Sequence, residues 1–445
     1  MRWIRWWLTG LIFFMPFQRM IVKSVEVWSR QVSFFINRIE EITVAVLLPL
    51  AIRELYKNRG IIDRSHIFLS IPFLAIVVSG FISGAVNGSS LIITSLGIFD
   101  YIKYFLFIFV YAAFFSDFSD FRKIFRLILI LTVCLVIVAF AQELWALHSR
   151  YIAGRCIYDK DNYLLGDSIF NIYRDSFREH WRLGIFRTPS LLRSPNFFGF
   201  YSLFILTMYF YLRRRVNLFV LFTLMGGIFV SVARMVYAGF LFLTGVQLFR
   251  SRRLFMILFI VPFLVILFYM STLWDFNIWK LTKQSLTAKV ESAKVTPYRK
   301  YAREKALEVW REYPFWGVGP GRFGGAVSIL FKSPLYEKYN FKPEENYLLR
   351  KWKSLDQFWP QVLTETGIFG TASFAVMFLT FFMVFLMLGK RLDDYDLKNL
   401  FSGLAVFTVI ILLWTFGGNI KNGVIFTYSA FAGIGLGCIN NKNKS

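Results

Sequence analysis

Long apolar segments separated by short polar ones run along nearly the whole chain. Most are roughly 17 to 25 residues long, the length that an α-helix needs to cross about 30 Å of hydrocarbon. The pattern predicts an all-α, polytopic integral membrane protein with about twelve transmembrane helices. The predicted spans are 6–18, 31–52, 67–86, 91–115, 124–147, 196–212, 217–232, 235–249, 254–274, 361–388, 399–416 and 422–439.

The composition leads to the same conclusion. With 56% hydrophobic and 20% aromatic residues, a soluble chain of 445 residues would carry too apolar a surface. The first apolar run is followed by Gln18, Arg19 and Met20 rather than by a small-residue cleavage site, which favours a retained anchor over a signal peptide. No linker or short-period repeat interrupts the pattern. Residues 1–445 are therefore expected to form a single membrane domain.

Lysine and arginine gather in alternate short connections, such as 53–64, 213–215 and 250–253. The turn 87–90 has no basic residue, and the turn 417–423 has only Lys421. Because basic residues accumulate in cytoplasmic loops, this alternation predicts that both termini are cytoplasmic.

Two connections are too long to be turns, 148–195 and 275–360, and the parity of crossings predicts that both are external. The larger one is expected to contain amphipathic helices. It also holds much of the basic excess of a chain whose formal net charge is +24. A cationic external segment suits anionic headgroups, diphosphates or acidic polysaccharide, although the charge could also serve only insertion and lipid contact. Nucleic acid is not an expected partner, because the basic region lies outside.

The sequence predicts neither a disulfide nor a metal site. Of the three cysteines, only Cys156 is predicted to be external. The three histidines, His66, His148 and His180, form no metal-ligand spacing. No cofactor is expected, and a metal-dependent mechanism would need a site made only of carboxylates.

Arg234 is the one charged residue in the apolar stretch 217–249. Because basic clusters flank this stretch on both sides, it is predicted to cross twice, with Arg234 at the outer turn. A cation there is costly unless it is paired or solvated, so Arg234 is a functional candidate, and its planar guanidinium suits phosphate oxygens. The alternative is an arginine that only snorkels at a helix end.

In the larger external connection, residues 299–313 favour an amphipathic helix that Pro314 would stop. The glycine-rich GVGPG that follows is either a ligand loop or only a turn. Further on, SLDQFWPQVLTETGIFG, residues 354–370, leads into an apolar run and carries Glu365 where that run would enter the membrane. Glu365 is either a site carboxylate or a favourable charge at a helix N-terminus.

The order of these motifs resembles the superfamily of O-antigen ligases and polymerases, which act on polyprenyl-diphosphate-linked glycans. The resemblance lies in SVARMVYAG, in the helix that ends in YPFWGVGPGRF, and in LTETGIFG, and it covers roughly residues 190–380. It implies that Arg234 and Arg299 hold the lipid diphosphate. The segment RTPSLLRSPNFFGFY is similar to a family stretch ahead of the central spans. The further substrate-binding candidates are Arg187, Arg193, Asn196 and Arg322.

One position departs from the family pattern. Ligases of the family carry a histidine, usually His-Asn, about nine residues before the glutamate, where this chain has Asp356 and Gln357. The substitution favours a polymerase over a ligase. Asp356 is the first candidate for the base that activates the acceptor hydroxyl, and Glu365 is the second. Asp356 could instead only pair with Lys351 or Lys353 on an exposed loop.

The resulting expectation is a metal-independent glycosyltransferase of the bacterial cytoplasmic (inner) membrane with its active site facing the periplasm. It would polymerise undecaprenyl-diphosphate-linked oligosaccharide repeat units into O-antigen or a related surface polysaccharide. Membrane lipids are expected partners, and a chain-length regulator protein is a candidate partner. The alternatives are an O-antigen ligase, a transporter or flippase for the same lipid-linked sugars, or a scaffold without chemistry. Transporters favour paired repeats around a midplane site.

Overall fold

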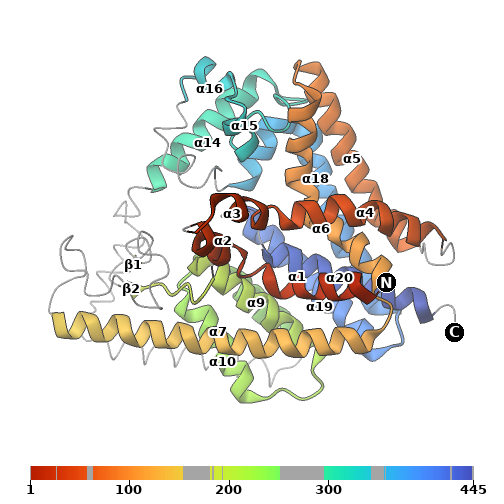
Figure 1. Cartoon of the computed structure of the whole chain (residues 1–445), viewed down its shortest axis with the longest axis vertical. Helices are drawn as coiled ribbons and strands as arrows, with labels where there is room; N and C mark the ends of the chain where they lie inside the picture. Colours follow the sequence, from red (N-terminus) through yellow and green to blue (C-terminus); the bar gives the residue numbers. More distant parts are fainter. Residues whose placement is uncertain are drawn as a thin grey trace.

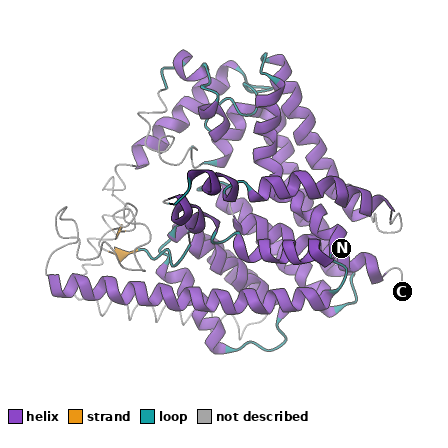
Figure 2. Cartoon of the chain, in the orientation of Figure 1, coloured by secondary structure: helices purple, strands orange, loops and turns teal. Residues whose placement is uncertain are grey.

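The computed structural model describes residues 2–26, 28–57, 64–153, 181–182, 185–192, 194–250, 295–341, 355, 357–420 and 423–442. These residues are almost entirely helical (Figure 1, Figure 2). The exception is a short antiparallel pair, β1 (Trp181–Arg182) with β2 (Ile185–Phe186). The helices are α1 (Arg2–Phe14), α2 (Gln18–Glu26), α3 (Arg30–Ile36), α4 (Ile39–Lys57), α5 (Arg64–Val86), α6 (Leu91–Phe114), α7 (Phe118–Ala153), α9 (Pro195–Leu212), α10 (Leu218–Val230), α11 (Arg234–Arg250), α14 (Val295–Glu312), α15 (Ala326–Leu330), α16 (Leu335–Lys338), α18 (Phe358–Arg391), α19 (Tyr395–Thr415) and α20 (Gly423–Lys442).

Five of these helices are long and apolar enough to cross a membrane, namely Ser65–Val86 of α5, α6, Phe118–Leu144 of α7, α18 and α19. Three further helices are apolar but shorter, namely Leu218–Val230, Arg234–Phe249 and Gly423–Ile439. The count of about twelve spans stays a prediction, and the predicted span 254–274 lies outside the described residues. Helix α2 did not appear in the sequence-based prediction, since it falls in polar sequence. The predicted span 31–52 is divided in the structure into α3 and α4, with Asn37 and Arg38 between them.

Helix boundaries follow local capping chemistry. The Ser90 side chain accepts a hydrogen bond from the Ile93 amide and starts α6. Ser194 does the same for α9, with Pro195 at the first helical position, where its missing N–H has no cost. Asn217 caps α10 and Asp394 caps α19. The turns between apolar runs thus carry the residues that end one helix and begin the next.

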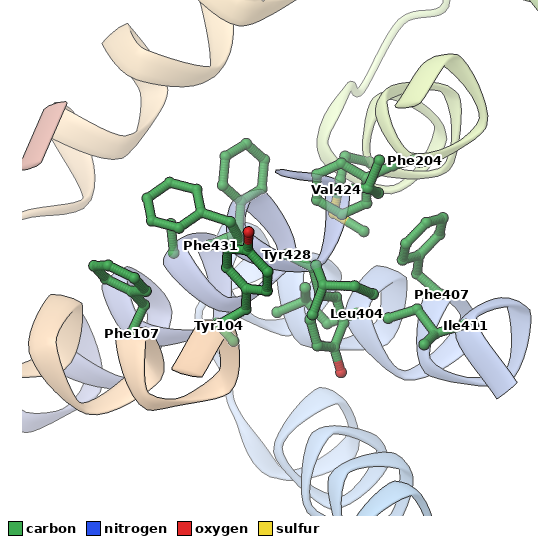
Figure 3. Packing of buried hydrophobic residues seen from close by; sticks show 14 of the residues in the cluster. Tyr104, Phe107, Phe204, Leu404, Phe407, Ile411, Val424, Tyr428 and Phe431 are labelled. Carbon is green, nitrogen blue, oxygen red and sulfur yellow. The ribbon is translucent and has the colours of Figure 1, made fainter. Parts of the chain in front are cut away.

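Aromatic side chains fill the centre of the helical bundle. Phe107 of α6 and Phe426 of α20 meet edge to face with ring centroids 4.6 Å apart. Phe204 of α9 lies 4.7 Å from Phe407 of α19. Figure 3 shows Phe431 and Tyr428 of α20 in the same cluster. Rings of this size fill the space between helices at low entropic cost, and edge-to-face pairs add about 0.5–1.5 kcal/mol each. α20 is therefore the central helix of the cluster.

A second, smaller apolar cluster forms between α14, α15 and α16, at the top of Figure 1. Ala302, Ala306 and Val309 of α14 are buried in it together with Phe323 and Phe341. This confirms the predicted amphipathic helix within 275–360, which ends at Glu312, before Pro314. The cluster is joined to α18, because the Thr364 hydroxyl donates a 3.0 Å hydrogen bond to the Ala306 carbonyl.

Candidate functional site

The first functional feature is a break in α18 at Gly367. The residue has φ 64° and ψ −162°, a backbone conformation that is essentially restricted to glycine. A break removes the helical partners of the carbonyls before it and of the amides after it. At membrane depth such groups need other partners within the protein. The sequence pattern alone predicted one continuous run here.

The YPFWGVGPG segment supplies these partners. Ahead of the break, the Thr364 carbonyl accepts from the Val318 amide at 2.9 Å, and the Glu365 carbonyl accepts from the Gly319 amide at 2.9 Å. Beyond it, the Ile368 amide donates to the Pro314 carbonyl at 2.9 Å. Two chain segments about fifty residues apart are thereby joined by backbone hydrogen bonds. The glycine-rich segment therefore caps both halves of the broken helix.

Glu365 secures the same segment through its side chain. Its Oε1 accepts from the Phe323 amide at 2.9 Å, and its Oε2 accepts from the Tyr101 hydroxyl at 2.6 Å. The Glu365 side chain is 1% exposed. Hydrogen bonds of this kind offset the cost of burying a carboxylate. The arrangement favours a positioning role for Glu365, and its catalytic role stays a prediction.

Arg322 and Asn87 tie the α5–α6 turn to the glycine-rich segment. Arg322 Nη1 donates to the Asn87 carbonyl at 2.7 Å and to the Val318 carbonyl at 3.2 Å. The Asn87 side chain donates from Nδ2 to the Gly317 carbonyl at 2.7 Å. The amides of Val318, Gly319 and Phe323 are likewise used inside the protein. The GVGPG segment thus serves as a structural turn rather than as a cradle of open amides for a phosphate, while substrate binding by Arg322 stays a prediction.

The second functional feature is the segment ahead of α9. Arg187 Nη2 donates a 2.5 Å hydrogen bond to Asn196 Oδ1, so two predicted site residues meet. Thr188 makes two hydrogen bonds that fix this segment. Its amide donates to the Val230 carbonyl at 3.1 Å, and its hydroxyl donates to Glu143 Oε2 at 2.8 Å. Asn196 is exposed, whereas Arg187 is half-buried.

Arg234 begins α11, immediately after the tight turn from α10, and it is exposed as predicted. Val232 in this turn has φ 44°, which is unusual for a β-branched residue. Strained backbone of this kind persists where the surrounding structure fixes it, and it clusters at functional sites. The Thr188 amide donates to the Val230 carbonyl at the end of α10, so the segment that carries Arg187 lies beside this turn. The two predicted arginines therefore belong to one neighbourhood.

Contacts between helix ends connect the two features. The Trp359 indole donates to the Thr415 hydroxyl at 2.8 Å, which holds the start of α18 beside the end of α19. The turn after α19 continues to Gly417, which packs against the Met235 side chain, next to Arg234. Arg299 lies on α14, two turns before the Ala306 that α18 contacts. The start of α11, which carries Arg234, is thereby linked through the end of α19 to the start of α18, and Arg299 lies on the helix that packs against α18.

Two predicted site residues, Asp356 and Arg193, lie outside the described residues, as does Cys156, which the sequence predicts to be external. Their roles stay predictions. Within the part of the chain that the structure describes, no group of three or more His, Cys, Asp or Glu could hold a metal ion.

Sequence reasoning missed two sets of buried charges. Glu143 is 4% exposed and lies at the C-terminal end of the α7 span Phe118–Leu144. On α6, Lys103 is 7% exposed and pairs with Glu41 at 2.7 Å and with Asp100 at 3.2 Å. The available signal was the presence of ionisable residues inside or beside apolar runs, which marks functional or paired positions.

These features define a polytopic membrane protein in which the helical segment α14–α16 is built onto the break in the long apolar helix α18. The model of a family described as O-antigen ligase matches residues 193–375 of the chain. The matched region runs from α9 into α18 and contains Arg234, Arg299 and Glu365. The match supports the resemblance to the superfamily of O-antigen ligases and polymerases. It also suggests a membrane function on lipid-linked glycans. No curated protein matches the chain.

Proposed function

We propose that this protein is a polysaccharide polymerase of the bacterial cytoplasmic membrane that uses undecaprenyl-diphosphate-linked repeat units at the periplasmic face. The growing glycan moves from its diphosphate carrier to a sugar hydroxyl of the incoming carrier-linked unit. The bond between the anomeric carbon and the diphosphate oxygen breaks, and a new glycosidic bond forms. The acceptor proton passes to a base, and the carrier leaves as the polyprenyl diphosphate.

The proposal is supported by the position of Arg234 after a turn that the Arg187 segment contacts, and by Arg299 on the helix that packs against the break in α18. A leaving diphosphate develops negative charge in the transition state, and fixed guanidinium groups stabilise that charge without a metal. The match to the O-antigen ligase family over residues 193–375 supports the same substrate class.

The glycine-rich segment has a supporting role in this proposal. Glu365 and Tyr101 hold it against α6, and Thr364 holds α14, which carries Arg299. Precise placement of groups that act on a reacting bond is worth several kcal/mol of the barrier. We therefore assign Glu365 to positioning and keep Asp356 as the proposed general base.

The test is an arginine series in purified enzyme supplied with the lipid-linked repeat unit. Because an ammonium does not replace a bidentate guanidinium, Arg234→Lys and Arg299→Lys are each expected to lose most polymer while the protein still accumulates in the membrane. The matched controls are Arg303→Lys, an exposed position one turn further along α14, and Arg213→Lys, exposed after α9. Wild-type chain length in both site variants would contradict the proposal.

A second measurement separates polymerase from ligase. A strain that lacks this protein should still attach single repeat units to the surface acceptor while losing long chains. Loss of single units as well would favour the ligase alternative. Activity that survives EDTA is expected, because the guanidinium groups carry the charge stabilisation, and a requirement for added Mg²⁺ or Mn²⁺ would contradict metal independence.

A further inference from the structure

The apolar surface that α18 exposes begins at the break. After Gly367, the exposed large apolar side chains of this helix are Ile368, Phe369, Val376, Leu379, Met383 and Met387. They recur at helical spacing and form one stripe. The stripe covers about 20 residues, which rise about 30 Å, the thickness of the hydrocarbon core of a bilayer. It therefore has the length of one complete membrane crossing, with the break at its start.

The part of α18 before the break has a different character. Four of its buried side chains are polar, namely Gln361, Thr364, Glu365 and Thr366. Beyond the break, no charged residue occurs before Lys390 and Arg391 at the other end of the helix. Because basic residues mark the cytoplasmic end of a span, the break is expected at the outer boundary of the hydrocarbon core.

Phe315 and Trp316 lie at this boundary. The Phe369 amide donates to the Phe315 carbonyl at 3.3 Å, and the Phe369 ring centroid lies 4.7 Å from that of Trp316 and 6.2 Å from that of Phe315. Phe315 is nevertheless 60% exposed. Aromatic side chains are enriched where a span meets the headgroups. The capping segment thus adds two rings to the outer end of the apolar stripe.

The backbone around these rings meets the condition that a lipid boundary imposes. Pro314 has no N–H, and its carbonyl accepts from the Ile368 amide at 2.9 Å. The Gly317 amide donates to the Tyr313 carbonyl at 2.9 Å, and the Gly317 carbonyl accepts from the Asn87 side chain at 2.7 Å. Non-helical backbone beside lipid needs such partners within the protein, because no water replaces them.

We propose that Phe315 and Trp316 form a membrane anchor that lies in the outer lipid interface and fixes the depth of the segment α14–α16. The partner of this apolar surface is the lipid bilayer itself. Since α14 ends at Glu312, just before the anchor, the anchor also sets the depth of the helix that carries Arg299. The inference goes beyond the proposed reaction, because it holds for a ligase as well as for a polymerase.

The test measures the depth of single side chains in vesicles of phosphatidylethanolamine and phosphatidylglycerol. The three cysteines of the full chain are replaced as Cys134→Ala, Cys156→Ser and Cys438→Ala. Phe315→Cys is then introduced and given a nitroxide label. The accessibility of the label is measured to oxygen, which concentrates in hydrocarbon, and to a nickel chelate, which stays in water. Val376→Cys on the exposed stripe is the lipid reference, and Arg303→Cys, exposed on α14, is the water reference.

The ratio of oxygen to nickel accessibility at Phe315 is expected to lie severalfold above the ratio at Arg303 and below the ratio at Val376, since the anchor is at the boundary and not at the centre. A ratio equal to that at Arg303 would place the segment in water and overturn the inference. A label shielded from both reagents would show that protein, rather than lipid, covers the surface, which would also overturn it.

A second measurement needs no cysteine replacement. In the same vesicles, Phe315→Leu keeps an apolar side chain and should leave Tm unchanged, whereas Phe315→Asp moves a charge into the lipid boundary and should lower Tm by a few degrees. The matched control is Asn340→Asp, which adds the same charge at an exposed position of the same segment and should be nearly neutral. Equal Tm values for Phe315→Leu and Phe315→Asp would contradict the anchor.

Discussion

The Tyr101 hydroxyl donates a 2.6 Å hydrogen bond to Glu365 Oε2 and thereby joins residues 264 positions apart. Tyr101 belongs to the interior of α6, and its side chain is 3% exposed. Through the second oxygen of Glu365, the same contact reaches the Phe323 amide. Helix α6 is thus linked directly to the glycine-rich segment that follows α14, the helix that carries Arg299.

Removal of this link gives the first prediction. Tyr101→Phe leaves the buried Glu365 carboxylate with one donor fewer and should destabilise the protein by about 1–3 kcal/mol. The measurement is the shift in Tm in detergent. Glu365→Gln retains an acceptor for Phe323 and should keep turnover within about tenfold of wild type if Glu365 only positions the segment. A fall of about 10² to 10⁴ would instead identify Glu365 as a catalytic base.

The break in α18 gives the second prediction. A Cβ at Gly317 would lie 2.5 Å from the Glu365 carbonyl carbon, and one at Gly367 would lie 2.3 Å from the Phe315 oxygen. Both residues also have positive φ, so Gly317→Ala and Gly367→Ala should separate the segment from α18 and abolish polymer.

The matched control for these two variants is Gly88→Ala. Gly88 also has a positive φ, of +61°, but a Cβ there would meet nothing within 4 Å. The Gly88→Ala substitution should lower the free energy of unfolding by about 1–2 kcal/mol, from backbone strain alone. Protein level and limited proteolysis of the external segment are the measurements. An equal loss of protein level and an equal gain in proteolysis in all three variants would mean that close packing at the break is unimportant.

The third prediction concerns the buried Lys103 and its two carboxylate partners, Glu41 and Asp100. Lys103→Met removes the cation that the two carboxylates share, leaves Glu41 paired with Arg38, and should destabilise the protein by roughly 3 kcal/mol. The double variant Lys103→Met/Glu41→Gln should lose less stability than the single one, because only Asp100 then faces the lost Lys103 cation as a charge. Thermal unfolding in detergent measures both, and a larger loss in the double variant would show that the pair is not the relevant interaction.

The fourth prediction concerns pH. A hydrogen bond from Lys338, 2.5 Å away, lowers the pKa of the exposed Glu312 carboxyl at the end of α14. A lowered carboxyl pKa contributes stability above the unfolded-state pKa of about 4.3, and this stability is lost as pH falls through the folded-state pKa. The Tm difference between wild type and Glu312→Gln should therefore be present at pH 7 and vanish in acid. A Tm difference that does not change with pH would instead show that Glu312 stabilises the protein through packing rather than through its charge.

The sequence by itself determined the all-helical class, most helix positions and the amphipathic α14. Apolar runs must satisfy their backbone hydrogen bonds internally in lipid, so their lengths and basic flanks alone predict membrane helices. The exposed position of Arg234 at the start of α11 also followed from local pattern, because the flanking basic clusters required a turn near the middle of the run.

Only the tertiary structure decided how these pieces meet. The break at Gly367 depends on capping by Val318 and Gly319, and the role of Glu365 depends on Tyr101; both are contacts between segments far apart in sequence. Periodicity reports which face of a helix is buried but not which partner covers it. Glu143 and Lys103 were overlooked for the same reason, since the cost of a buried charge is met by neighbours that only folding brings close.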